Sequence, residues 1–593
     1  MSATSRARPA PLFTFAIITD THIRPPGGDE SSPFPVNELA NARARYAVQA
    51  IARHAPAFTI HLGDMVHPLP HLPSYDAAAR EALEILSPLG DSLRFVPGNH
   101  DIGDKPMAGA PAGAADEEST RIYARHFGPP WYSFDHDGVH FVVMNASLVG
   151  SRSALEDEQR AWLEEDLARN SGGRILLFSH YPPFIDTADE PTHYDNYEPA
   201  GRAWLLRCAE KSGVEAIFSG HVHQFFYNRH AGTAFYCLPP TSFTRQDYSE
   251  LYQIGPASEF GRNDLCKFSY ALVDIYPEGH RLRVIPTRGR GLDPGEAITE
   301  DDPVAARPAP APFTVHVRHA WARAFHMPYN GPMEEFGRKR ARDDYLLLRL
   351  WQMGISCIRT PLADLLDPGY RRRIDDFHAA GIRFTFFCAG MPDAGAWRAC
   401  LEAREMIDAV ECVTSTTDLS DLGDALSRFD ADGGPPLRLG KFHSSAHEPK
   451  QGTRFAHSVS YGFLWAERED VRRALARHDR RGVIRSLAFQ LNLADAVKQR
   501  LAEMDDWAQE QDLEVAAVIR LADPNPAQPN FDDAAILERV REAVEAAGSL
   551  ARTSLQLDTF ADIDRGYHPR HGLIDRRSNM RRAGVYLAGR EEP

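Results

Sequence analysis

Five short polar segments, each directly after an apolar run typical of a β-strand, constrain the fold of this chain more than any other feature. They are Asp20-Thr21-His22, Gly63-Asp64, Gly98-Asn99-His100-Asp101, Ser179-His180 and Gly220-His221-Val222-His223. In open α/β sheets, ligands bind in the loops beyond the carboxyl ends of the strands. The pattern therefore predicts an α/β protein whose chemistry lies on these strand-exit loops.

The first half of the chain alternates strands and amphipathic helices, as a layered α/β sandwich requires. Strands are expected at 13–19, 58–62, 93–97, 131–135, 140–145, 174–179 and 216–219, and helices at 37–54, 75–86, 156–169 and 200–212. Asp137-Gly138 lies between two of these strands and is a strong hairpin-turn signal. The segment 108–119, rich in small and acidic residues, is expected to be a mobile loop.

The second half begins after a Pro/Ala-rich linker at 299–312 and has a more regular strand–helix alternation. Strand-like runs occur at 313–319, 355–360, 382–388, 407–413, 437–443, 483–490, 513–520 and 554–560, and helical stretches include 339–353, 370–380, 469–480 and 532–547. Gly354, Gly381 and Gly482 each stand between a helix and a strand, where a glycine ends the helix. Eight such units in about 280 residues predict a closed (β/α)8 barrel. The expected domains are 1–298 and 313–593, joined by the linker.

The polar blocks supply the side chains of a two-metal site. Carboxylate and imidazole ligands suit Fe, Mn or Zn, and two neighbouring ions need a bridging carboxylate and roughly three further ligands each. The His-x-His spacing places His221 and His223 on the same side of an extended segment, so that each can reach a different ion.

In this order, DxH…GD…GNH[D/E]…H…GHxH, the blocks resemble the signature of the calcineurin-like metallophosphoesterase superfamily, over roughly residues 11–290. Within it they are most similar to the bacterial cyclic-nucleotide and glycerophosphodiester phosphodiesterases. The resemblance implies a four-layer α/β/β/α sandwich that binds two metal ions.

The resemblance also implies a role for each residue of the blocks. The first metal would be held by Asp20, His22 and His223, and the second by Asn99, His180 and His221, with Asp64 bridging both. An activated hydroxide would attack phosphorus, and His100 would contact the phosphate or protonate the leaving oxygen. Purple acid phosphatases carry a tyrosine at the position of His67, so a ferric–tyrosinate centre is not expected.

Candidate substrate contacts lie in two loops. His193 and Tyr194 belong to the polar, aromatic loop 186–197, which is either a pocket rim or a solvated surface loop. Arg245 either clamps a phosphate or forms a surface salt bridge.

In a barrel, function lies at the carboxyl ends of the strands. The candidates there are Glu411, His443, Arg520 and Asp558. The tail from Asp558 to Arg577 resembles the end of barrel-fold glycoside hydrolases, but the seventh strand lacks the Glu that such barrels carry. A non-catalytic barrel that recognises part of the substrate or buries a dimer interface is the other reading.

Composition excludes several classes of partner. The chain has 66 Lys+Arg and 82 Asp+Glu, a net charge of −16, which disfavours a nucleic-acid polymer as partner. The apolar runs are too short to span a bilayer, and no signal peptide is evident. The seven cysteines are scattered and do not predict a disulfide framework. We therefore expect a cytoplasmic protein that does not engage a membrane.

These observations predict a hydrolase with two metal ions that cleaves a small phosphodiester, of the cyclic-nucleotide or glycerophosphodiester type. Three alternatives stay open: a phosphomonoesterase, a bifunctional enzyme whose barrel processes a glycoside, and a non-catalytic scaffold. The metal's identity, the role of the barrel and the formation of a homo-oligomer are not determined by the sequence.

Overall fold

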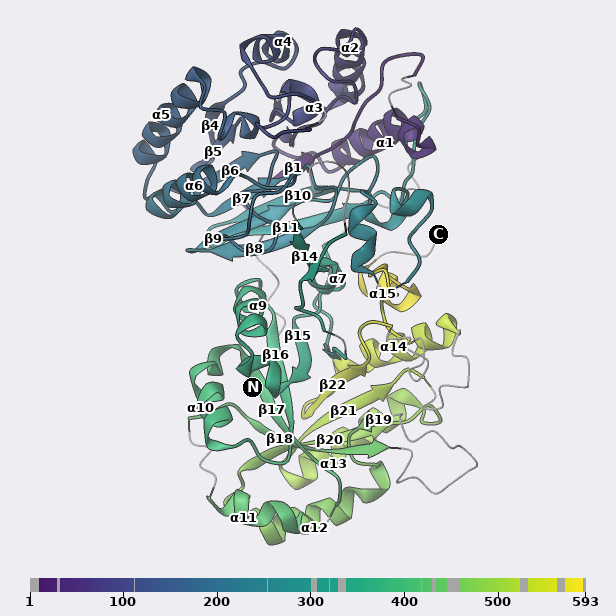
Figure 1. The fold of residues 1–593 in the computed structure, drawn as a ribbon. Helices are drawn as coiled ribbons and strands as arrows, with labels where there is room; N and C mark the ends of the chain where they lie inside the picture. The colour runs from purple at the N-terminus through teal and green to yellow at the C-terminus, as the bar shows by residue number, and fades with distance from the viewer. Residues whose placement is uncertain are drawn as a thin grey trace. The chain divides into compact units, whose positions relative to one another are not determined.

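The computed structural model describes residues 10–28, 32–110, 112–252, 254–299, 307–318, 320–328, 338–417, 419–428, 433–444, 459–522, 532–562 and 571–589. The chain forms two compact units (Figure 1). The N-terminal unit comprises residues 5–305 and 324–348, and the C-terminal unit comprises residues 306–323 and 349–593.

Two large β-sheets form the centre of the N-terminal unit. One has the strand order β11-β10-β1-β2-β3, and the other has the order β4-β5-β6-β7-β9-β8. The strands are β1 (Phe13–Ile18), β2 (Thr59–His61), β3 (Leu93–Phe95), β4 (Tyr132–His136), β5 (Val139–Met144), β6 (Arg174–Ser179), β7 (Ala216–Ser219), β8 (Phe226–His230), β9 (Thr233–Cys237), β10 (Ser269–Tyr276) and β11 (Gly279–Pro286). Its helices are α1 (Ala40–Ala52), α2 (Tyr75–Leu86), α3 (Asn99–Ile102), α4 (Glu117–Phe127), α5 (Ala154–Arg169) and α6 (Pro199–Ser212).

The two sheets pack face to face through aromatic side chains. The ring centroid of Phe15 on β1 lies 5.5 Å from that of Phe141 on β5 and 6.0 Å from that of Phe178 on β6. Because side chains alternate along a strand, Ala16 of β1 points the other way, into a core shared with α1 and α2. Val142 of β5 likewise packs in a core shared with α5 and α6. This order of layers confirms the α/β/β/α sandwich.

One expected loop is partly helical. Helix α4 begins inside the segment 108–119, because the Asp116 carboxylate accepts a hydrogen bond from Ser119 N (2.8 Å) and caps the helix. Tyr123 and Phe127 then bury one face of α4. Strands β8 to β11 follow the last strand range expected above, 216–219.

The C-terminal unit is the expected barrel of eight parallel strands. The strands follow one another around it as β12, β15, β16, β17, β18, β20, β21 and β22, and β22 pairs with β12 to close the ring. Their bounds are β12 (Phe313–His316), β15 (Cys357–Pro361), β16 (Arg383–Ala389), β17 (Ile407–Thr414), β18 (Leu437–Ser444), β20 (Ile484–Leu491), β21 (Glu514–Arg520) and β22 (Thr553–Asp558). A further short strand, β19 (Val459–Tyr461), pairs antiparallel with β18.

Helices separate most of the barrel strands. They are α8 (Leu362–Leu366), α9 (Pro368–Ala379), α10 (Ala394–Glu402), α11 (Ser420–Arg428), α12 (Arg468–His478), α13 (Val497–Gln511) and α14 (Asp533–Ala547), and α15 (Arg582–Leu587) follows the last strand. Gly354, Gly381 and Gly482 have φ of 69°, 88° and 63°, the left-handed conformation expected of a glycine that ends a helix.

Residues 324–348 follow the linker in sequence but pack with the N-terminal unit. They contain β13 (Phe325–His326), β14 (Arg340–Ala341) and the start of α7 (Tyr345–Met353). Tyr227 N of β8 donates to Asp344 Oδ2 (2.9 Å), and Arg342 Nη2 donates to Tyr227 O (3.1 Å). The compact units therefore differ from the expected domain ranges of 1–298 and 313–593, which assign this segment to the barrel. The helix expected at 339–353 begins only at Tyr345, because the preceding residues are extended and anchored on β8.

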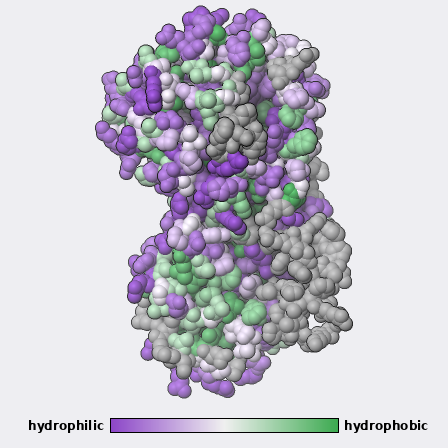
Figure 2. All heavy atoms as spheres, in the orientation of Figure 1, coloured by the Kyte–Doolittle hydropathy of each residue, from purple (hydrophilic) through white to green (hydrophobic). Residues whose placement is uncertain are grey.

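The surfaces of the units differ in polarity on the face shown in Figure 2. Hydrophilic residues cover most of the N-terminal unit there, whereas hydrophobic residues gather on part of the C-terminal unit. Among the described residues, no helix combines the length and the apolar character that a membrane span needs.

Candidate metal centre

The strand exits bring the predicted ligands together on a strained backbone. Five of them have positive φ: Asp20 (52°), His22 (45°), Asp64 (53°), His221 (65°) and His223 (54°). Residues other than glycine rarely adopt this conformation, and such strain clusters at functional sites. Asp20 N donates to Gly63 O (3.1 Å) and His22 N to Asp64 O (3.0 Å), so that the exits of β1 and β2 are tied to each other.

Glycines allow the blocks to approach this closely. A Cβ atom on Gly98 would lie 2.1 Å from Asp64 N, and one on Gly63 would lie 2.4 Å from His180 Nδ1. Both positions therefore exclude any side chain.

The first group of ligands contains Asp20, His22, Asp64 and His223, whose ligand atoms all lie within 4.8 Å of one another. His223 Nε2 lies 3.1 Å from His22 Nε2 and 3.2 Å from Asp20 Oδ1. His223 Nδ1 donates to Phe243 O (2.6 Å). In the neutral ring, the lone pair is then on Nε2, the atom that faces the group.

The second group contains Asp64, His180 and His221, again within 4.8 Å. His180 Nδ1 donates to Leu62 O (2.8 Å), so its Nε2, 3.3 Å from Asp64 Oδ1, is the atom that becomes a ligand when it loses its proton. Asn99 Oδ1 lies 2.9 Å from His221 Nδ1 and adds an amide oxygen. Asp64 belongs to both groups, which is the position a bridging carboxylate must occupy.

The electrostatics of the two groups favour a bound cation. Burial raises the pKa of Asp64, but His180 and His100 lower it more, and the carboxyl stays ionised. Burial lowers the pKa of His180, but Asp64 and Asp20 raise it more, to about 9. Burial lowers the pKa of His221 to about 3 and that of His22 well below its ordinary value, so both rings are neutral ligands at pH 7.

The donor set fits two metal ions. Carboxylate, amide and imidazole donors converge from buried positions, and His180 Nε2 has no hydrogen-bond partner there. A buried polar atom without a partner is costly unless a ligand satisfies it. Such O/N sites accept Fe, Mn and Zn alike, so the donors do not identify the metal.

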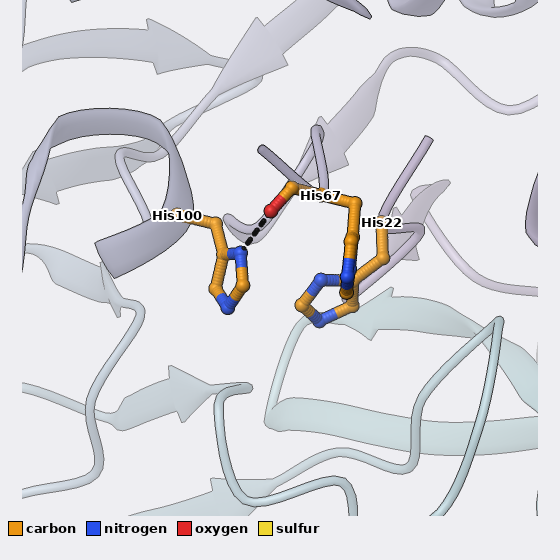
Figure 3. A group of neighbouring side chains, drawn as sticks. All are labelled: His22, His67 and His100. Atoms are coloured by element: carbon orange, nitrogen blue, oxygen red, sulfur yellow. Dashed lines mark hydrogen bonds between the residues drawn. The ribbon is translucent and has the colours of Figure 1, made fainter. Parts of the chain in front are cut away.

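A third group of side chains lies beside the first and includes a residue that the sequence reading did not place in the site. His22, His67 and His100 direct their rings into the same space (Figure 3). His100 Nδ1 donates to His67 O (2.5 Å), and the two rings are stacked with centroids 5.4 Å apart. His67 and His100 are half-buried, whereas the ligands are buried, so they form the open side of the site.

The predicted substrate contacts have different outcomes. Tyr194 lies next to the second group of ligands: its ring centroid is 4.9 Å from that of His221, and its hydroxyl accepts a hydrogen bond from Asn99 Nδ2 (3.3 Å). His193 is buried and its Nε2 lies 3.1 Å from Glu190 Oε1. Arg245 forms ion pairs with Asp195 and Asp247 (3.3 Å to Asp247 Oδ2), so its partners are buried carboxylates rather than surface groups.

Two charged residues next to the centre were missed. Asp195 Oδ1 lies 3.5 Å from His221 Nε2, and Lys339 Nζ donates to Asp195 Oδ2 (2.6 Å). Asp195 lies in the polar loop that the sequence singled out, but Lys339 lies far along the chain and matches no motif.

The two acidic barrel candidates are ion-paired with arginines, whereas the recorded contacts of His443 and Arg520 involve backbone carbonyls. Glu411 is buried and accepts two hydrogen bonds from Arg359 (3.1 and 2.8 Å), and Asp558 is paired with Arg318. His443 Nε2 lies 2.9 Å from Gly462 O. Arg520 is half-buried at the end of β21, where its backbone carbonyl accepts a hydrogen bond from Arg539 Nε (3.0 Å).

Comparison with known proteins agrees with this geometry. Residues 13–225 match the family model described as calcineurin-like phosphoesterase, which places such a domain in the N-terminal part of the chain. Mouse serine/threonine-protein phosphatase CPPED1 is 30% identical over 188 residues, which is 30% of this chain and 57% of that protein. Arabidopsis thaliana purple acid phosphatase 23 is 28% identical over 177 residues, 29% of this chain and 36% of that protein. The chain thus spans just over half the length of the CPPED1 relatives that it matches.

Among solved structures, the purple acid phosphatase PPD1 from yellow lupin seeds is 16% identical, with a TM-score of 0.34 over 48% of this chain and 53% of that chain.

Proposed function

We propose that the N-terminal unit is a phosphoester hydrolase that depends on two metal ions. The observation that carries this proposal is the position of Asp64, a buried, ionised carboxylate shared by two groups of ligands. The match of residues 13–225 to the calcineurin-like phosphoesterases supports it.

In this proposal the ligands divide as the family resemblance implies. Asp20, His22 and His223 would hold one metal, Asn99, His180 and His221 would hold the other, and Asp64 would be shared by both. When bound, two such ions neutralise the phosphoryl oxygens and activate a water for in-line attack.

His100 acts on the substrate. Its Nδ1 is held as a donor by His67 O, so in the doubly protonated ring Nε2–H is the group that contacts a phosphoryl oxygen or passes its proton to the leaving oxygen. Its backbone N–H donates to Asp64 Oδ1 (2.9 Å), which keeps the side chain close to both groups of ligands. Tyr194 lines the site beside His221.

The class of ester is a further proposal. The motif resemblance favours a small phosphodiester, such as a cyclic nucleotide or a glycerophosphodiester. The names of CPPED1 and of the purple acid phosphatases favour a phosphomonoester instead, and this is our second candidate. In both cases the substrate is a small phosphoester rather than a nucleic-acid polymer, and a cytoplasmic location stays a prediction.

The barrel is proposed to be non-catalytic. Burial raises the pKa of Glu411, but Arg359 lowers it more, so this carboxyl is not the protonated acid that a glycosidase needs. Asp558 is paired with Arg318 in the same way. Recognition of part of the substrate or formation of a homo-oligomer stays open for this unit.

The test is metal analysis of the full chain together with hydrolysis of bis(p-nitrophenyl) phosphate and p-nitrophenyl phosphate. We expect about two metal ions per chain and cleavage of at least one ester, with the ratio of kcat/KM values deciding between diester and monoester. A protein that binds no metal after reconstitution with Mn²⁺, Fe²⁺ or Zn²⁺ would refute the proposal and favour the scaffold alternative.

A further inference from the structure

Next to the second group of ligands, the N-terminal unit buries a cluster of four charged side chains. It consists of Asp195, Arg245, Asp247 and Lys339, and we call it the Asp195 cluster. The side chains of both aspartates and of Lys339 are fully buried, and that of Arg245 is 12% exposed. Two carboxylates and two cations make the cluster neutral as a whole. Burying charged side chains costs free energy, so a gain in stability does not by itself explain why the protein has this cluster.

Asp195 is the member of the cluster that faces the metal centre. Its Oδ1 lies 3.5 Å from His221 Nε2 and its Oδ2 accepts a hydrogen bond from the hydroxyl of Tyr248 (2.7 Å). The opposite nitrogen of the same ring, His221 Nδ1, lies 2.9 Å from Asn99 Oδ1. The ring therefore has its Nδ1 on the ligand side and its Nε2 on the carboxylate side.

His221 Nε2 makes no hydrogen bond among the described residues, and Asp195 Oδ1 at 3.5 Å is placed to accept one from it, as a carboxylate that orients a metal-ligating histidine does. A carboxylate that accepts the second ring N–H fixes the tautomer, so that the ligating nitrogen keeps its lone pair, and it makes that nitrogen more basic. The rings of Tyr181 and Tyr194 pack against this imidazole, with centroids 4.0 and 4.9 Å from that of His221.

Lys339 reaches this cluster from the segment that follows the linker. Its Nζ donates to Asp195 Oδ2 (2.6 Å) and to Asp247 Oδ2. The segment is fixed by the pairing of β13 with β14 and by the hydrogen bond from Met327 N to Lys339 O (2.8 Å). Met327 and Ala341 pack in the same apolar cluster as Tyr248, so the ammonium group is delivered by a folded element rather than by a loose chain.

We propose that Asp195 and Lys339 are positioning residues of the metal centre: Lys339, together with Arg245, holds the Asp195 carboxylate against His221 Nε2, and this orients His221 Nδ1 toward the second metal. Residues 338–344 are then part of the phosphoesterase site although they follow the linker. This inference rests on the proposed function, because it assigns His221 to a metal.

The experiment measures binding of Co²⁺ to the full chain. Metal-free wild type, Asp195→Asn, Lys339→Met and the double variant are titrated with Co²⁺ against a competing chelator, while the absorption bands of bound Co²⁺ are recorded. Asp189→Asn is the matched control, because Asp189 is an exposed aspartate of the same loop. We expect both single variants to lose about 10- to 100-fold in affinity for one of the two Co²⁺ ions, as the loss of an outer-sphere partner does. The other ion and the control are expected to behave as in wild type.

The double variant tests whether Lys339 acts through Asp195. It removes one charge of each sign and keeps the cluster neutral, so it stays informative where Lys339→Met fails to fold. An affinity equal to that of Asp195→Asn supports the proposal, whereas a loss equal to the product of the two single losses would show that Lys339 acts separately.

The failure of this inference differs from the failure of the proposed function. Folded Asp195→Asn and double variants that bind two Co²⁺ ions with wild-type affinity and unchanged absorption bands would overturn the positioning role alone. A wild type that binds no metal would overturn both.

Discussion

Replacing His100 with alanine tests the division between residues that hold metal and residues that act on substrate. In His100→Ala the backbone N–H that donates to Asp64 Oδ1 is retained, and the side chain contributes no atom to either group of ligands that shares Asp64. The variant loses the hydrogen bond to His67 O, which contributes only ~0.5–1.5 kcal/mol to stability. Metal content and fold are therefore expected to survive.

The expected loss is in the chemical step. General acid assistance is typically worth ~10²–10⁴-fold, which corresponds to about 2.7–5.4 kcal/mol of activation free energy. The assay is kcat on bis(p-nitrophenyl) phosphate and p-nitrophenyl phosphate, with metal content measured on the same samples. His71→Ala is the control, because His71 is an exposed histidine of the neighbouring loop.

Two results would refute this reasoning. A kcat within about threefold of wild type would remove His100 from the reaction. Loss of one metal together with activity would make His100 a ligand, in the group that it forms with His22 and His67.

Four further outcomes are expected. Asp64→Asn removes the shared carboxylate and should lower the bound metal to at most one ion per chain, by mass spectrometry; two retained ions would contradict its bridging role. Dipicolinate should abolish hydrolysis and added Mn²⁺ or Zn²⁺ should restore it, unless the activity is independent of metal. Glu411→Gln leaves the buried Arg359 without its charged partner and should lower the free energy of unfolding, measured in urea, by ~3–5 kcal/mol. The exposed control Glu405→Gln should change it by less than ~0.5 kcal/mol, and equal effects of the two variants would contradict a stabilising ion pair. Burial raises the pKa of Glu215, but its hydrogen-bonded partners lower it more, from 4.5 to about 2. The stability that this carboxylate adds is therefore complete above pH 4.5 and lost as the pH falls toward 2. The difference in unfolding free energy between wild type and Glu215→Gln should shrink over that interval, and a constant difference would exclude this linkage.

Most of the helices and strands could be predicted because the sequence signals that specify each one lie within a few residues of it. The apolar run before Asp20 and the turn after it sit within a few residues of each other, so β1 and its exit loop are visible together. The glycines that end barrel helices, such as Gly354, act through their own backbone. The five blocks then meet because β1, β2 and β3 end at one edge of the first sheet, β6 and β7 end at one edge of the second, and the two sheets pack face to face.

The remainder depends on contacts between distant residues. Lys339 pairs with Asp195 across 144 positions, and neither residue has a neighbour in sequence that indicates the partner. Helix α4 was missed because its start is set by the Asp116 cap and its buried Tyr123, while the residues before it are small and acidic. Glu411 was visible as a carboxylate at a strand end, but its ion pair with Arg359 was not.

The return of residues 324–348 to the N-terminal unit has a consequence for biosynthesis. Translation proceeds at about 5–20 residues per second, and N-terminal domains begin to fold as they emerge. Both sheets of this unit are complete by residue 286, yet Lys339 is made about 3–11 s later at that rate. During this interval, the Asp195 cluster lacks one of its two cations. A nascent chain halted at the linker should therefore present an immature site to metal, and a ribosome stalled beyond residue 348 should present a finished one.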